Sequence, residues 1–134
     1  MIVYNSDYST IHCLEGMDML YTEWKESSSD LSEEELKTEM EQILQQVEEH
    51  HTKNIIADTS RFKYKATQKT QRWIGRFFMA DIIEMGVKKY AIIVPKEVYP
   101  QFEGDNNEEE LYEGFKVKYF MSKDQAMNWL ISDD

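Results

Sequence analysis

Two short, uniformly apolar segments, residues 54–58 and 90–94, constrain the fold of this chain more than any other feature. Each is too short and too evenly apolar for a half-exposed strand, so each is predicted to be a buried strand of a parallel sheet. Between them, apolar residues recur at helical spacing over residues 67–85, with Thr67 as the N-cap and Gly86 directly after the end. This strand–helix–strand order indicates a βαβ unit and therefore an α/β fold.

The segments before this unit predict a hairpin and a helix. Residues 8–14 and 19–24 are rich in strand-forming residues and are separated by a short loop, which favours an antiparallel hairpin. Ser32 and Glu35 have the spacing of a capping box, in which each side chain satisfies a free backbone amide at the start of a helix. We therefore expect a helix over residues 32–50.

The last third of the chain predicts one more strand and one more helix. Residues 115–120 are expected to form the strand, and Ser122 begins a second capping box that opens the terminal helix. Residues 96–113 are predicted to be a helix or a broken helix. The whole chain, residues 1–134, is then one domain with a mainly parallel central sheet, an N-terminal hairpin and about four helices.

Composition excludes several classes of protein. Hydrophobic residues make up 41% of the chain, enough for one core, while the net charge of −11 argues against nucleic acid or an anionic membrane surface as a partner. No apolar run approaches the roughly 20 residues that a membrane span needs, and no secretory signal is visible. Cys13 is the only cysteine, so an internal disulfide is excluded and a cytoplasmic location is expected.

Several stretches of the sequence resemble one known family. They are Leu20 to Trp24, Ile55 to Asp58, Gly86 to Pro95, Val117 to Phe120 and Gln125 to Leu130. In this order they resemble the STAS/SEC14-like families, specifically the SpoIIAA-like proteins, over nearly the whole chain. The resemblance implies a STAS-like fold and a regulatory binding module that is not an enzyme.

The resemblance also implies where a regulatory serine would lie. Members of the anti-sigma-factor-antagonist type are phosphorylated on a serine in an Asp-Ser-Ser-Gly-type motif at the start of the second helix. Here Asp58, Thr59 and Ser60 stand near that place without the following Gly-Leu, and Ser60 precedes the Thr67 cap by several residues. We therefore do not expect a phosphorylation switch at Ser60.

The sequence contains no recognisable catalytic or cofactor-binding motif. There is no GxSxG elbow, no phosphate-binding glycine loop and no Rossmann fingerprint. His12 and Cys13 are neighbours on a predicted strand, so their side chains point to opposite faces, and Cys13 is expected in the core. His50 and His51 are adjacent on a helix and lack the spacing of a helical metal site. We expect no enzyme activity, no metal and no cofactor.

The most informative feature for function is a segregation of charge. Residues 59–80 contain six basic residues and no acidic one, whereas residues 103–113 contain six acidic residues and no basic one. Spacing places three of the basic residues on one helical face, and aromatic residues are interleaved with them. Asp58 adds a carboxylate at the end of a buried strand, where open α/β sheets bind ligands. The candidate binding residues are Asp58, Arg61, Lys63, Lys65, Lys69, Arg72, Trp73 and Arg76.

Three interpretations of the basic segment stay open. It can bind an anionic ligand or an acidic protein surface, it can meet the acidic segment of its own chain or of a second copy, or it can be an ordinary solvated face. The leading hypothesis is a STAS-like module that recognises a protein partner, including itself, through the loop after the Asp58 strand and the following helix. The alternative is a small amphipathic or lipid-like ligand between the sheet and the second helix, with Trp73, Phe77 and Phe78 lining a cavity.

Overall fold

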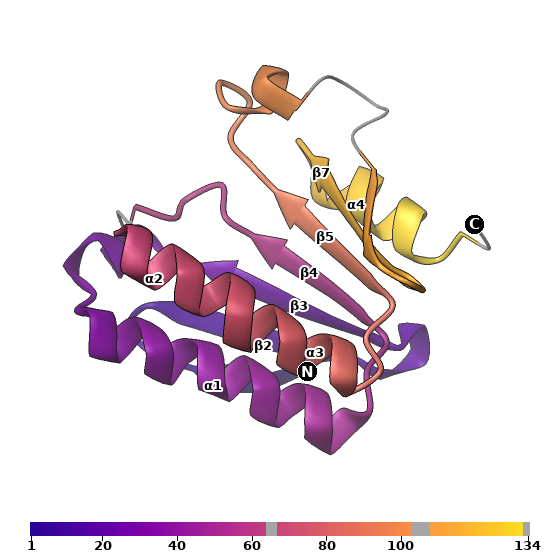
Figure 1. Cartoon of the computed structure of the whole chain (residues 1–134), viewed down its shortest axis with the longest axis horizontal. Helices are drawn as coiled ribbons and strands as arrows, with labels where there is room; N and C mark the ends of the chain where they lie inside the picture. The colour runs from indigo at the N-terminus through magenta and orange to yellow at the C-terminus, as the bar shows by residue number, and fades with distance from the viewer. Residues whose placement is uncertain (64–66, 103–107, 133–134) are drawn as a thin grey trace.

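The computed structural model describes residues 1–63, 67–102 and 108–132 and shows a mixed α/β fold (Figure 1). One seven-stranded sheet forms its centre, in the order β1-β2-β3-β4-β5-β7-β6. The strands are β1 (Ile2–Asn5), β2 (Ser9–Leu14), β3 (Met19–Trp24), β4 (Asn54–Asp58), β5 (Lys89–Ile93), β6 (Glu109–Tyr112) and β7 (Phe115–Phe120). The helices are α1 (Glu33–His50), α2 (Gln68–Trp73), α3 (Met79–Glu84) and α4 (Lys123–Leu130).

The middle of the sheet is parallel and both of its ends are antiparallel. β3, β4, β5 and β7 run parallel to one another, with Leu20, Ile55, Tyr90 and Val117 side by side across the four strands. β1 and β2 add two antiparallel strands next to β3, and β6 pairs antiparallel with β7 at the other edge. The predicted N-terminal hairpin and the two buried strands are confirmed.

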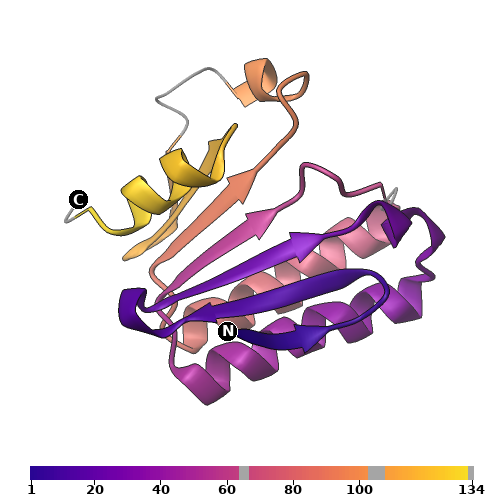
Figure 2. The ribbon, with the colours of Figure 1, turned by 180° about the vertical axis from the view of Figure 1, so that it is seen from behind.

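Helices cover both faces of the sheet, but unequally. α1 lies beside a longer helix formed by α2 and α3 on one face, over β2, β3 and β4, and α4 lies alone on the other face (Figures 1 and 2). Alternate strand residues therefore enter two separate cores. Leu20 and Ile55 pack with Phe78 in the larger core, whereas Ile56 and Ala91 pack with the α4 helix in the smaller one.

α1 begins where the sequence predicts. Ser32 is its N-cap, and the reciprocal hydrogen bonds of a capping box join Ser32 and Glu35. One turn later Glu39 is buried against the start of the sheet, where its carboxylate accepts hydrogen bonds from the hydroxyls of Tyr4, Ser6 and Ser9. This contact fixes α1 to the turn between β1 and β2.

α2 and α3 form one uninterrupted helix, joined by a π-helical turn (η3, Ile74–Phe78). We call it the 68–84 helix. The Thr67 hydroxyl accepts a hydrogen bond from the Thr70 amide at its start, and Gly86 follows its end with a positive φ of 99°, as the sequence predicts. The wide π turn adds a residue to the helix and so changes which side chains face the core after it.

Two sequence-based expectations are wrong. The segment 96–113 holds a short 3-10 turn (η4, Tyr99–Phe102) and the edge strand β6, where a helix was expected. The described residues consequently contain three long helices, α1, the 68–84 helix and α4, and not about four. None of the helices within the described segments is long and apolar enough to cross a bilayer.

Candidate functional site

A shallow groove between α1 and the 68–84 helix gathers positive charge and aromatic surface. Its volume is about 290 Å³. We call it the basic–aromatic groove, and its lining residues are Lys37, Lys69, Arg72, Trp73, Arg76 and Phe77. The structure thus brings together four of the binding residues predicted from the sequence, and adds Lys37 from α1. The four are Lys69, Arg72, Trp73 and Arg76.

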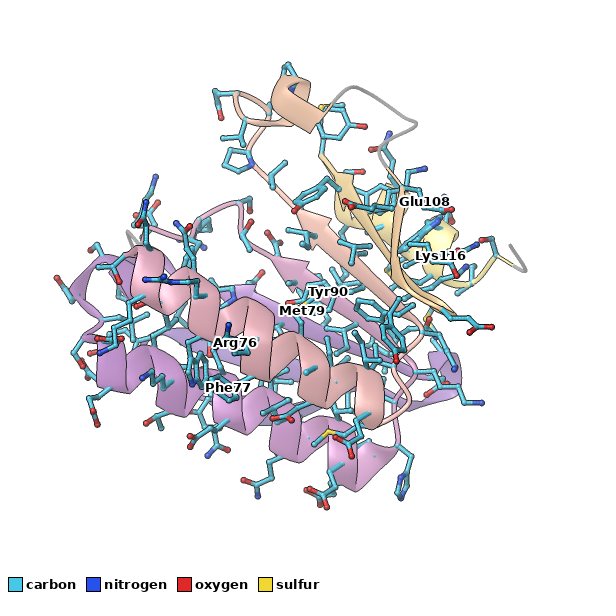
Figure 3. All side chains as sticks on the ribbon, viewed as in Figure 1. Arg76, Phe77, Met79, Tyr90, Glu108 and Lys116 are labelled. Carbon is cyan, nitrogen blue, oxygen red and sulfur yellow. The ribbon has the colours of Figure 1, made fainter. Side chains whose placement is uncertain are left out.

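The aromatic side of the groove follows from the path of the 68–84 helix. Trp73 is half-buried and lies under the Lys37 ammonium, 5.4 Å from the ring centroid, in a cation–π contact. Within the π turn, Phe78 points into the core while its neighbour Phe77 is 53% exposed (Figure 3). An exposed phenylalanine beside several cations gives the groove an apolar contact that a plain solvated face lacks.

The cations of the groove are largely unneutralised. Lys37 lies 3.8 Å from Glu33 in an ion pair on the surface of α1. For Lys69, Arg72 and Arg76, the described part of the chain supplies neither a hydrogen bond nor an ion pair. Three exposed and unpaired positive charges along one helix favour a negatively charged partner. Such a partner is attracted to them without first having to displace an acidic side chain of the same chain.

Asp58 lies on the opposite face of the sheet from this groove. Its carboxylate accepts hydrogen bonds from the Tyr21 hydroxyl at 2.6 Å and from the Ser60 hydroxyl at 2.6 Å, and from the Ser60 amide at 3.0 Å. Burial, and next the hydrogen bond to Asp58, raise the pKa of the Tyr21 phenol. Asp58 therefore orders the loop after β4 through contacts within the chain, as a strand-end Asx turn does.

The loop after β4 contributes exposed charge but does not line the groove. The side chains of Arg61 and Lys63 are exposed. Between them, Phe62 packs edge-on against Trp24 with the ring centroids 4.9 Å apart, and the Lys63 amide donates to the Ser28 hydroxyl at 2.8 Å. Lys65, another predicted binding residue, lies outside the described residues.

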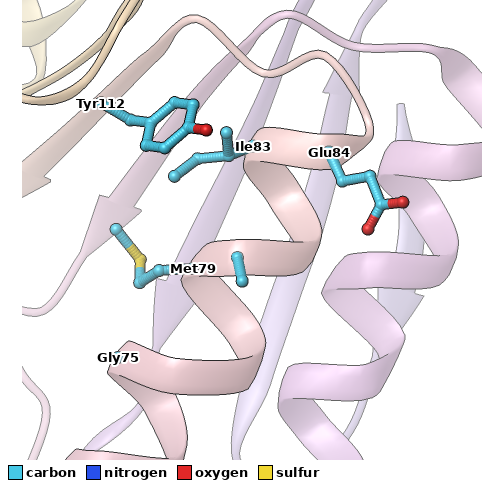
Figure 4. Close-up of a pocket in the computed structure, with 6 residues that line it drawn as sticks. Gly75, Met79, Ile83, Glu84 and Tyr112 are labelled. Atoms are coloured by element: carbon cyan, nitrogen blue, oxygen red, sulfur yellow. The ribbon is translucent and has the colours of Figure 1, made fainter.

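A second, more apolar groove lies on the other flank of the 68–84 helix (Figure 4). Its volume is about 640 Å³. Met79 and Ile83 point from the helix toward Tyr112 of β6, which is 64% exposed. We call it the apolar groove, and its lining residues are Gly75, Met79, Ala80, Ile83, Glu84 and Tyr112.

The expected aromatic cavity is only partly found. Trp73 and Phe77 lie on the α1 side of the helix, whereas Phe78 is 1% exposed in the main core and lines neither groove. The apolar space next to the sheet is instead lined by Met79, Ile83 and Tyr112. Because residues 96–113 were expected to form a helix, the sequence did not place Tyr112 beside the 68–84 helix.

His12 and Cys13 point to opposite faces of β2, as strand geometry requires. The His12 ring packs edge-on against Tyr21 with the centroids 5.8 Å apart, and Cys13 is buried in the main core. Among residues 1–63, 67–102 and 108–132, no three or more His, Cys, Asp or Glu side chains group in a way that could hold a metal ion.

Comparison of the chain with protein-family models, curated proteins and solved structures finds no match. The resemblance to the SpoIIAA-like proteins therefore stays a prediction.

Proposed function

We propose that this chain is a non-enzymatic, STAS-like binding module that recognises an acidic protein segment through the basic–aromatic groove. The observation that supports the proposal is the convergence of Lys37, Lys69, Arg72 and Arg76 around exposed aromatic surface. Arginine and aromatic side chains are enriched where proteins bind one another. Arg61 and Lys63 lie in the loop before the 68–84 helix and add exposed positive charge on the approach to it.

The chemistry of the groove favours a carboxylate-rich peptide over a nucleic acid. A duplex binder neutralises many phosphates along an extended basic surface, but here the basic helix belongs to a chain with a net charge of −11. Phe77 offers an apolar contact next to Arg76, which suits a segment that mixes acidic and apolar side chains. A single surface ion pair is worth only about 0–1 kcal/mol, so several must act together.

Charge reversal in the groove tests this function. The variant Lys69→Glu, Arg72→Glu, Arg76→Glu should weaken binding of a short fluorescent peptide, rich in glutamate and carrying one phenylalanine, by at least about tenfold. Fluorescence anisotropy of the labelled peptide measures the dissociation constant. Circular dichroism checks that the variant is folded, which is expected because all three side chains are exposed.

A matched variant controls for net charge. Lys53, Lys88 and Lys96 are also exposed and lie outside the groove, so reversing these three changes the net charge by the same amount. The control should retain most of the affinity for the peptide. Equal losses in the two variants would show non-specific attraction and contradict the proposal.

The apolar groove supports a second candidate function, the binding of a small amphipathic or lipid-like ligand. Its volume of about 640 Å³ lies within the range of small-molecule sites, roughly 300–1,000 Å³. The groove lies between the sheet edge and the 68–84 helix, with Glu84 as a polar group at one end. This function predicts that the chain purifies with a bound amphiphile, seen as added mass in native mass spectrometry and lost in the bulkier variant Ala80→Trp.

A further inference from the structure

The 68–84 helix is itself divided by charge. Its first half carries Lys69, Arg72 and Arg76, and its second half carries Asp81 and Glu84. At about 25 Å, it is long enough for the two halves to form separate electrostatic surfaces. A helix that is positive at one end and negative at the other is complementary to a second copy of itself running in the opposite direction.

The outward face of this helix is also exposed to solvent and accessible to a partner. Arg72, Arg76, Ala80 and Glu84 recur at four-residue spacing and are all exposed. Within the described residues no hydrogen bond or ion pair joins the side chain of Arg72, Arg76 or Glu84 to the rest of the chain. Ala80 is small, so a partner helix can come close at the middle of the stripe.

We propose that the acidic partner of the basic–aromatic groove is the second half of the same helix in a second copy of the chain. The proposal rests on the function proposed above and names the partner. In a two-fold pairing of antiparallel helices centred on residue 78, Arg72 of each copy lies opposite Glu84 of the other. Because a two-fold contact is isologous, the contact between Arg72 and Glu84 occurs twice in each dimer.

The same register also brings Arg76 close to a second acidic residue of the other copy. A two-fold axis across antiparallel helices keeps each flank of the helix facing the same flank of the other copy, so the basic–aromatic grooves of the two copies lie on the same side of the contact. Arg76 comes opposite Ala80, whose small side chain leaves room for Arg76 to reach the Asp81 carboxylate of the other copy.

A charge swap tests the register. Sedimentation equilibrium of the full chain at low salt should show a reversible dimer, which high salt weakens. Arg72→Glu and Glu84→Arg, made separately, should each raise the dimer dissociation constant by about tenfold or more, because two like-charged contacts arise in every dimer. Mixing the two single variants should restore association, since each then supplies the charge that the other lacks.

Three outcomes would overturn the proposal. They are a chain that stays monomeric at every concentration, single variants that dimerise as the original chain does, and a mixture of the variants that fails to associate. Glu48→Arg, an exposed reversal on α1, is the control and should leave the dimer intact. A monomer that still binds the acidic peptide of the preceding section overturns self-association alone, whereas failure to bind that peptide contradicts the proposed function.

Discussion

Glu39 is the buried residue whose contacts most directly tie sequence to fold. It is 4% exposed, and its carboxylate accepts hydrogen bonds from three hydroxyls, of Tyr4, Ser6 and Ser9. A buried carboxylate is tolerated only when its oxygens are satisfied, so the three donors and the acid depend on one another. Burial, followed by the hydrogen bond to Glu39, raises the pKa of the Tyr4 phenol and keeps it a donor.

Replacing Glu39 by glutamine should destabilise the protein by about 1–3 kcal/mol, because neutral hydrogen bonds replace charge-assisted ones and a hydroxyl loses its acceptor. The free energy of unfolding in urea measures the loss. Glu41, exposed on the same helix, gives the matched control, and Glu41→Gln should change stability by less than about 0.5 kcal/mol. Equal losses of unfolding free energy in the two variants would show that the hydroxyl cluster around Glu39 does not contribute to stability.

Individual residues show what a sequence pattern can and cannot place. The spacing of Lys69, Arg72 and Arg76 was enough to predict one common face, because helical periodicity fixes it. Lys37 could not be assigned to that face, since nothing in the sequence says which face of α1 meets the second helix. Neither could Phe77 be distinguished from Phe78, because a π turn shifts the periodicity locally and has no simple sequence signal.

Among the elements, those with explicit start and stop signals were predicted best. Ser32 and Thr67 cap their helices as expected, and Gly86 follows the second helix with the positive φ that glycine tolerates. These signals act through local hydrogen bonds and backbone sterics, which do not depend on the rest of the fold. Local chemistry therefore makes such boundaries readable from the sequence.

β6 was missed because its composition reflects its place at the edge of the sheet. Glu109 and Glu110 lie on an outermost strand, where charged side chains protect unpaired backbone groups from other chains. Such a strand lacks the apolar run that marks a buried one. The signal that was available is Gly114, whose φ of +82° closes the turn into β7.

At the scale of the whole molecule, three buried or half-buried tyrosines couple stability to alkaline pH. Burial raises the pKa of Tyr90, and to a smaller degree the charge of Tyr119 raises it too. Burial and the charge of Glu109 raise the pKa of Tyr119. Burial and the hydrogen bond to Asp58 raise the pKa of Tyr21 as well. In the unfolded chain these phenols ionise near pH 10, below their folded pKa values. Their contribution to stability is therefore complete below about pH 10 and is lost as the pH rises further.

Tyr90→Phe should make unfolding less sensitive to alkali. Above about pH 10 each such tyrosine steepens the fall of the unfolding free energy by up to about 1.4 kcal/mol per pH unit, and the variant removes one of them. Urea unfolding at several pH values between about 8 and 11 measures the slope. Tyr112→Phe, at an exposed position, is the control. A slope in Tyr90→Phe equal to that of the original chain would contradict this account.

The order of strands in the sheet has a consequence for how the chain is made. Synthesis proceeds from the N-terminus, and β5 receives its outer neighbour β7 only after the intervening segment has been added. Until then β5, with Tyr90 and Ile92 on one side, is an open edge. α4 comes last, and the buried Lys89 ammonium secures it by donating to the carbonyls of Trp129 and Ser132. Chains truncated before residue 115 should therefore aggregate through the open edge of β5, whereas chains that also contain β7 cover this edge.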